Sequence, residues 1–136
     1  MRLLRGKRPA NLGARNGRLQ PPPRTPKGVS SQADPKADPG HFIAPLSFKG
    51  NPKEAWARLV QQLRGLPGVT IVKDAAGYLH AECASRLLGF VDDLECVLDR
   101  KTGVIHVRSA ARLGRRDFGV NRARIEKLRA GMASPA

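Results

Sequence analysis

Short runs in which apolar and polar residues alternate dominate the second half of the chain. Strict alternation sends successive side chains to opposite faces of a β-strand, so these runs predict half-buried strands. The predicted strands cover 41–48, 69–73, 78–85, 94–99 and 104–110. Pro45 lies within the first of them, which predicts an edge position because proline cannot donate a hydrogen bond to a sheet ladder.

The turn between 94–99 and 104–110 predicts how these two strands pair. If Asp99 faces Val104, the apolar residues of both strands fall on the same face, so this register is self-consistent. The same register sets Glu95 directly opposite Arg108 on the polar face. Such an opposite-charge pair contributes about 0.2–1 kcal/mol when it is exposed.

Two segments carry the spacing of amphipathic helices. The first covers 51–64, where Asn51 is a favourable N-cap residue. Its apolar side chains recur on one helical face at Trp56, Leu59, Val60 and Leu63. The second helix begins at Asn121, which we predict as its N-cap.

Together these elements predict an α+β domain with the order β-α-β-β-β-β-α, in which two helices pack on one face of an antiparallel sheet. By analogy this is the order of the TATA-binding-protein-like and helix-grip folds, although fold analogy does not supply a function. A Pro-rich extended N-terminal arm precedes the domain. Residues 1–40 are expected to form this extended or disordered Pro/Arg-rich arm, without helix or sheet ladders. The domain itself is expected at 41–131, and 132–136 as a disordered tail.

The net charge of +14 lies at the two ends of the chain. Residues 1–31 carry a net charge of +8, residues 32–111 of +1 and residues 112–136 of +5. A basic arm attracts nucleic acid or an anionic membrane through a salt-dependent, sequence-independent force, so weak polyanion binding by residues 1–31 is one hypothesis. The other is a solvated arm that only aids solubility, which the absence of interleaved aromatic residues favours.

The sequence also bears on location. No apolar run approaches the length of a transmembrane helix, and the basic start is not followed by the apolar segment of a secretory signal. Read from this chain alone, the expectation is a cytoplasmic protein without a transmembrane segment.

Carboxylates are dense in a segment that otherwise has the pattern of a buried strand. Asp92, Asp93 and Glu95 fall within four positions, and arginines that can pair with them follow. The candidate binding residues are Arg86, Asp92, Asp93, Glu95, Arg108, Arg112, Asn121 and Arg122. They form either a patch that binds an anion or partner through arginine forks, or a structural ionic network that fixes strand register and docks the last helix. Strict alternation points Asp92 inward, so a bulge marked by Gly89 is expected beside it.

The sequence supports a metal site or an active site less than it supports the charged binding patch. A metal ion would use the imidazoles and carboxylates of the polar face: His80, Glu82, Asp93, Glu95 and His106. No compact ligand motif accompanies them, so we predict neither a metal nor a cofactor. The serines lack a nucleophile-elbow context, and Cys83 and Cys96 fall on the apolar face where thiols are usually inert, so we predict no catalytic residue.

Three motifs give the chain a family resemblance: Gly89-Phe90-Val91-Asp92-Asp93 with Glu95, Arg108-Ser109-Ala110 with Arg112, and Gly119-Val120-Asn121-Arg122. With these motifs in this order, the chain resembles the domain-of-unknown-function 1499 family of bacterial and plastid proteins. The resemblance implies an uncharacterised bacterial protein and assigns no activity. Relatives usually carry a membrane or export segment, so the resemblance implies a membrane-associated or periplasmic location as the alternative.

The sequence therefore predicts a non-enzymatic domain that binds an unknown protein or small ligand on its charged sheet face. Polyanion binding through the basic arm is the alternative hypothesis. An enzyme with a pocket on a curved sheet is the second alternative.

Overall fold

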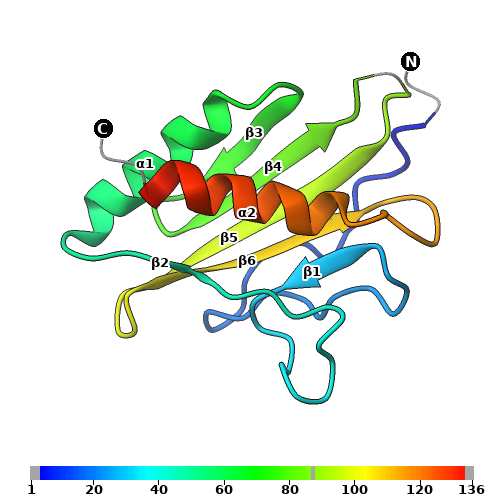
Figure 1. The fold of residues 1–136 in the computed structure, drawn as a ribbon. Helices are drawn as coiled ribbons and strands as arrows, with labels where there is room; N and C mark the ends of the chain where they lie inside the picture. Colours follow the sequence, from blue (N-terminus) through cyan, green and yellow to red (C-terminus); the bar gives the residue numbers. More distant parts are fainter. Residues whose placement is uncertain (1–3, 87, 134–136) are drawn as a thin grey trace.

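The computed structural model describes residues 4–86 and 88–133. Its elements are β1 (Gly28–Ser30), β2 (Leu46–Ser47), α1 (Pro52–Arg64), β3 (Val69–Asp74), β4 (Tyr78–Ala84), β5 (Val91–Asp99), β6 (Val104–Ala111) and α2 (Val120–Ala133). The fold is α+β, and from β2 onward the order is the predicted β-α-β-β-β-β-α. Both helices lie across the same face of the sheet (Figure 1).

The strands form one antiparallel sheet in the order β1-β6-β5-β4-β3, and the short β2 pairs with a separate part of β6. The predicted register of β5 and β6 is confirmed, since Asp99 lies opposite Val104 and Glu95 opposite Arg108. The predicted strand 41–48 is shorter than expected, because β2 begins only at Leu46. Its predecessor is Pro45, which has no N–H to extend the pairing.

The hydrophobic core lies between the sheet and the two helices. Asn51 caps α1 as predicted, because its side chain accepts a hydrogen bond from the Lys53 amide. Large core side chains with almost no exposed surface come from both layers: Leu46, Leu59, Leu63, Leu79, Leu94, Ile105, Ile125 and Leu128. The period-two pattern of the strands and the helical stripe of α1 therefore meet across one interface.

The beginning of α2 differs from the prediction. Asn121 lies inside the helix, which begins at Val120, and its side chain is fully buried. Asp117 satisfies the free amides instead, because its carboxylate accepts hydrogen bonds from the Gly119 and Asn121 N–H groups. The predicted N-cap is therefore wrong, since the loop before α2 folds an earlier acceptor over the helix end.

The bulge expected beside Asp92 is also wrong. The pairing of β5 with β4 and with β6 passes through Asp92 without a shift. The sheet's register shift lies in β3, between Ile71 and Lys73. Asp92 points toward the helix face, where Arg124 of α2 forms an ion pair with it. Because the carboxylate is paired there, the strand does not need a bulge that would turn it toward solvent.

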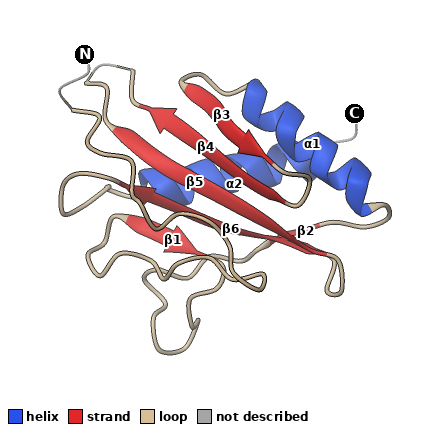
Figure 2. Ribbon diagram, turned by 180° about the vertical axis from the view of Figure 1, so that it is seen from behind, coloured by secondary structure: helices blue, strands red, loops and turns tan. Residues whose placement is uncertain are grey.

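The arm, defined from here on as residues 4–27, lies on the face of the sheet opposite the helices (Figure 2). Its hydrogen bonds reach β4, β5 and β6 through Arg5, Gly13 and Pro21 respectively. The next residues form β1, which pairs with β6, so the expectation that 1–40 builds no sheet ladder is wrong. The prolines exclude a long strand there, but Gly28–Ser30 contains none of them.

At the other end, α2 continues to Ala133 and so includes the start of the segment 132–136 that was expected to be a tail. Residues 134–136 lie outside the described residues. Among the residues that the structure describes, no helix has both the length and the apolar character needed to cross a membrane.

Gly68 makes the closest backbone approach at the entrance to β3. Its φ is +76°, and a Cβ atom there would lie 2.4 Å from the carbonyl oxygen of Ala84. We expect Gly68→Ala to lower the free energy of unfolding by about 1–3 kcal/mol, because the new methyl group is strained and collides with backbone. Gly40→Ala is the control, because a Cβ there meets nothing within 4 Å. Urea denaturation measures both variants, and equal losses would contradict the steric argument.

Candidate functional site

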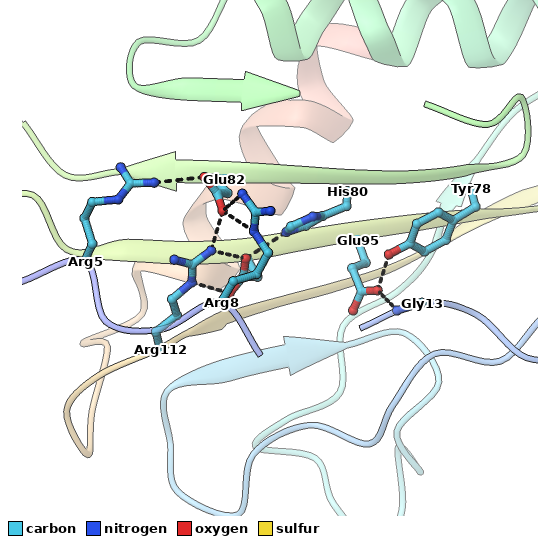
Figure 3. A network of polar contacts seen from close by, with 9 residues as sticks. Arg5, Arg8, Gly13, Tyr78, His80, Glu82, Glu95 and Arg112 are labelled. Atoms are coloured by element: carbon cyan, nitrogen blue, oxygen red, sulfur yellow. Dashed lines mark hydrogen bonds and ion pairs between the residues drawn. The ribbon is translucent and has the colours of Figure 1, made fainter. Parts of the chain in front are cut away.

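A cluster of buried charged side chains occupies the sheet face beneath the arm. We call it the arm-face cluster, and its members are His80, Glu82, Asp93 and Arg112. Arg112 binds both carboxylates, with hydrogen bonds of 2.7 and 2.8 Å to Asp93 and of 2.6 Å to Glu82. His80 Nε2 lies 2.7 Å from Asp93 Oδ1 (Figure 3). The period-two alternation of β4 and β5 brings these carboxylates to one face.

The arm closes over this cluster with two further arginines. Arg5 and Arg8 donate hydrogen bonds of 3.0 and 2.8 Å to opposite oxygens of Glu82. The side chain of Arg8 is 54% exposed, whereas that of Arg112 is 4% exposed. Arg112 is thus an interior group, and the two arm arginines form an outer layer at the protein surface.

The electrostatics of the arm-face cluster favour the charged forms. Burial by itself raises the pKa of Asp93 and of Glu82, but hydrogen bonds and positive charge from Arg112 outweigh it, and both pKa values are lowered. The hydrogen bond to Asp93 in turn raises the pKa of Arg112. Both carboxylates are therefore ionised and paired at neutral pH, which leaves little uncompensated charge to attract a ligand.

Glu95 lies farther along the same face and is fully buried. Its Oε2 accepts hydrogen bonds from the Gly13 amide, at 2.7 Å, and from the Tyr78 hydroxyl (Figure 3). Arg108 lies opposite in register but donates to the carbonyl oxygen of Pro21, at 3.1 Å. No ion pair within 4.0 Å joins Glu95 and Arg108 among the described residues, so both side chains serve chiefly to hold the arm.

The arm-face cluster contains the kinds of side chain that bind metal ions. Ligand atoms of His80, Glu82 and Asp93 lie within 4.8 Å of one another, and all three residues are buried. Imidazole and carboxylate ligands suit zinc. Arg112, however, already binds both carboxylates and supplies the positive charge that a metal ion would bring. We therefore interpret the set as an ion-pair network, and the absence of a metal stays a prediction.

On the helix face, a second group of polar side chains connects the sheet to α2. Asp92 pairs with Arg124 at 2.9 Å. Asn121 Oδ1 accepts hydrogen bonds of 2.6 Å each from Ser109 Oγ and from Arg124. Burial raises the pKa of Asp92, and the charge of Arg124 offsets this only in part. Asp92 thus binds a proton more readily than an ordinary aspartate.

The eight candidate residues therefore do not form one site. Asp93, Glu95, Arg108 and Arg112 lie on the arm face, whereas Asp92 and Asn121 lie on the helix face. Arg122 donates to the carbonyl oxygens of Gly40 and Phe42, and Arg86 is exposed in the loop between β4 and β5. Since neighbouring strand residues point to opposite faces, Asp92 and Asp93 cannot act on one ligand together.

A pocket of about 360 Å³ opens at the end of the sheet where β4 meets β5 and where β6 leads into α2. Apolar side chains make most of its wall, and an ion pair stands on one side. Its lining includes Cys83, Phe90, Asp92, Leu113, Phe118 and Arg124. Arg116 and Asp117 line it too, and together with Phe118 they also line a second hollow of about 260 Å³. We call the larger cavity the end pocket.

Phe118 lines both hollows and has an unusual backbone conformation. Its φ is +53°, a left-handed value that bulky residues rarely adopt, and 90% of its surface is exposed. Such backbone strain costs about 1–3 kcal/mol and is concentrated at functional sites. An exposed aromatic ring on a strained backbone at the mouth of a pocket points to a role other than stability.

The motif resemblance is supported by comparison with family models. The model described as "Protein of unknown function (DUF1499)" matches residues 18–132. The chain belongs to this family. No curated protein and no solved structure matches it. The family model thus includes all strands and both helices up to Met132, but it begins after the arm arginines Arg5 and Arg8.

The sequence pattern missed two parts of this DUF1499 protein. The sequence predicts the arm arginines as solvated or polyanion-binding charge and not as partners of Glu82, because nothing in a proline-rich segment marks which face it covers. The end pocket was missed because its lining comes from the ends of several strands and a loop. The pairs Gly89-Phe90 and Phe118-Gly119, aromatic residues beside loop glycines, were the signal available.

Proposed function

We propose that this protein is a non-enzymatic binding domain whose end pocket takes a small amphipathic anion. The apolar part of the ligand lies against Phe90, Leu113 and Phe118. Its anionic group meets Arg116 and Arg124. The observation that carries this proposal is a mainly apolar cavity with a few charged groups on one side, Arg116 and Arg124 beside Asp92 and Asp117, and such a composition is usual for small-ligand sites.

The ion pair in the pocket wall supports an anionic ligand. Arg124 is shared between Asp92, Ser109 and Asn121, so it is held in place before a ligand arrives. Asp92 has a raised pKa because of burial, and it is the one partner of Arg124 that can lose its charge. An incoming anion competes with Asp92 for the guanidinium and favours protonation of that carboxylate.

The charged sheet face is a weaker candidate for ligand binding. Two of its carboxylates, Glu82 and Asp93, are buried, ionised and paired with arginines, and the arm covers the face. We therefore infer that Glu82, Glu95 and Arg108 hold the arm on the sheet. Asp93 and Arg112 support them, because Asp93 fixes the guanidinium that bonds Glu82. The alternative of polyanion binding by residues 1–31 loses two of its cations, because Arg5 and Arg8 are engaged with Glu82.

The enzyme alternative lacks an activated group in the end pocket. Cys83 is the candidate nucleophile of the wall, but burial raises the pKa of its thiol to about 11. The reactive thiolate is therefore a minor form at neutral pH. We favour binding over catalysis on this ground.

Titration calorimetry with decanesulfonate tests the proposal. This probe has an apolar chain and a charge that does not change with pH, so we expect saturable binding accompanied by proton uptake at Asp92. Affinity should rise as the pH falls, because the bound anion raises the pKa of Asp92 further. Decanol lacks the anionic group, and we expect it to bind about tenfold or more weakly.

Matched substitutions connect the binding to the pocket. Ala111 lines the cavity, so Ala111→Phe fills it and should abolish decanesulfonate binding. Ala57→Phe places the same ring on the exposed side of α1 and should leave binding unchanged. Thermal unfolding checks that both variants fold. Equal binding by the two variants, or equal affinities for decanesulfonate and decanol, would disprove the proposed ligand chemistry.

A further inference from the structure

Exposed apolar side chains gather at one end of the molecule. Six large hydrophobic residues are exposed among the residues that the structure describes. Four of them line the end pocket, and a fifth lies in the β4–β5 loop, which supplies other residues of its lining. We call these five the apolar tip: Leu88, Phe90, Leu113, Phe118 and Val120. They come from the β4–β5 loop and from the segment that leads from β6 into α2, which lie at the same end of the sheet in Figure 1. The remaining one, Val72, lies in β3.

The same loops carry cations with little opposing charge. Arg86, Arg115 and Arg116 are exposed beside the apolar tip. Asp117 is the acidic residue of the loop, and its carboxylate is occupied by the Asn121 side chain and by the backbone amides at the start of α2. Apolar side chains next to unpaired arginines complement a surface that offers hydrocarbon and negative charge together.

We propose that the apolar tip docks this protein onto anionic membrane surfaces, with Phe118 inserted at the depth of the headgroups and the arginines against the lipid phosphates. This goes beyond the proposed function, because docking does not require an occupied pocket. Membrane-surface proteins combine inserted apolar side chains with basic residues, and each arginine near an anionic leaflet adds roughly 1 kcal/mol.

The composition of the patch favours a membrane over nucleic acid. Bases stack on aromatic rings, but three members of the apolar tip, Leu88, Leu113 and Val120, are aliphatic and offer no stacking face. A protein partner would have to place acidic groups opposite Arg86, Arg115 and Arg116, whereas an anionic leaflet offers phosphates across its whole surface. A lipid surface offers hydrocarbon to the apolar tip and phosphate groups to the neighbouring arginines at the same time.

Vesicle co-sedimentation of the full chain tests the docking. We expect binding to phosphatidylglycerol-rich vesicles, weak binding to pure phosphatidylcholine vesicles, and release as salt is added. Phe118→Asn should lower the partition coefficient about tenfold without loss of stability, since asparagine tolerates the left-handed backbone. Val72→Asn removes the exposed apolar residue that lies away from the tip, and it should bind as the unaltered protein does.

A charge-matched pair separates a specific surface from general attraction. The double variant Arg115→Glu with Arg116→Glu reverses two positive charges beside the apolar tip. The double variant Arg100→Glu with Lys101→Glu makes the same charge change in the turn between β5 and β6, at the opposite end of the sheet. We expect the first pair alone to reduce vesicle binding about tenfold or more. Equal losses from both pairs, no vesicle binding at all, or concentration-dependent self-association through the tip would overturn the proposal.

The two proposals fail in different ways. Ala111→Phe closes the end pocket but leaves the tip exposed, so it should abolish decanesulfonate binding and keep vesicle binding. Loss of both properties in this folded variant would overturn independent docking. Vesicle binding without decanesulfonate binding in the unaltered protein would remove the proposed function and leave the membrane surface standing.

Discussion

Arg112→Met is expected to lower the free energy of unfolding by about 3–5 kcal/mol, the usual cost of breaking a buried ion pair from one side. The guanidinium is 4% exposed and bonds two buried carboxylates, Asp93 and Glu82. Methionine fills a similar volume without donors, so among the described residues Asp93 keeps His80 alone as a side-chain partner. Urea denaturation at neutral pH measures the loss.

Arg8→Met is the matched control for this change. Arg8 bonds the same Glu82, but its side chain is 54% exposed and solvated. Exposed ion pairs contribute about 0–1 kcal/mol, so the control should lose little stability. If the two variants lost equal stability, burial of the Arg112 pairs would not be the source of their strength.

The pH dependence gives a second readout. The folded-state pKa values of Asp93 and Glu82 are lowered, so their stabilising contribution is present above the unfolded pKa values and is lost as the pH falls through the folded ones. In Arg112→Met, burial dominates and we expect it to raise the pKa of Asp93 above its unfolded value. Protonation of Asp93 in acid then stabilises the folded state of the variant relative to its unfolded state. The difference between the two proteins should therefore shrink steadily from neutral pH to about pH 3. A constant difference would contradict the electrostatic cause.

Neutralising the two carboxylates that lose Arg112 should recover part of the lost free energy of unfolding. Arg112→Met combined with Glu82→Gln and Asp93→Asn removes the uncompensated negative charge while it keeps the shapes of the side chains. Replacing a whole buried ionic network is often far less damaging than breaking it. We expect the triple variant to be more stable than Arg112→Met alone, by denaturation under the same conditions.

The strand pattern predicted the sheet and the sides on which its charges lie. Alternation separated Asp92 from Asp93, because a period of two sends neighbouring side chains to opposite faces. The turn that pairs Asp99 with Val104 then set Glu95 opposite Arg108. The strand pattern did not predict which arginines pair with the carboxylates. Arg112 reaches Glu82 across a separation of 30 residues, and Asp92 finds Arg124 on a helix whose rotation the strand pattern does not determine.

The arm was beyond prediction for a different reason. Proline-rich sequence has no hydrophobic period, so it carries no signal for the face on which it lies. The arm is held partly through its backbone, by the Gly13 amide and the Pro21 carbonyl, which every sequence possesses. Its arginines bind Glu82 across separations of 77 and 74 residues. Composition therefore gave its charge and extended form, but not its position on the sheet.

Asn121→Ala is expected to lower the free energy of unfolding by about 2–4 kcal/mol, because several buried partners lose their bonds together. The amide Nδ2 donates to Asp117 Oδ2 at 2.9 Å and to the Lys27 carbonyl oxygen at 3.3 Å. The amide oxygen accepts from Ser109 and Arg124. One side chain thus joins α2 to β6 and to the strand entrance at β1. Alanine is the better helix former, so helix propensity works against the expected loss.

Asn121→Asp distinguishes the donors from the overall fit. The carboxylate has the shape of the amide but cannot donate. One of its oxygens then faces Asp117 and a backbone carbonyl, and this repulsion opposes the attraction that the other oxygen gains from Arg124. We expect at least the loss seen with alanine at neutral pH, and recovery as the pH falls, because the folded pKa of the new carboxyl is raised above its unfolded value. Arg122→Ala is the control on the neighbouring position, where the side chain bonds carbonyl groups at the surface. If Asn121→Asp matched the unaltered protein at neutral pH, the amide donors would carry no weight; if it recovers in acid, the α2–β6–β1 junction depends on them.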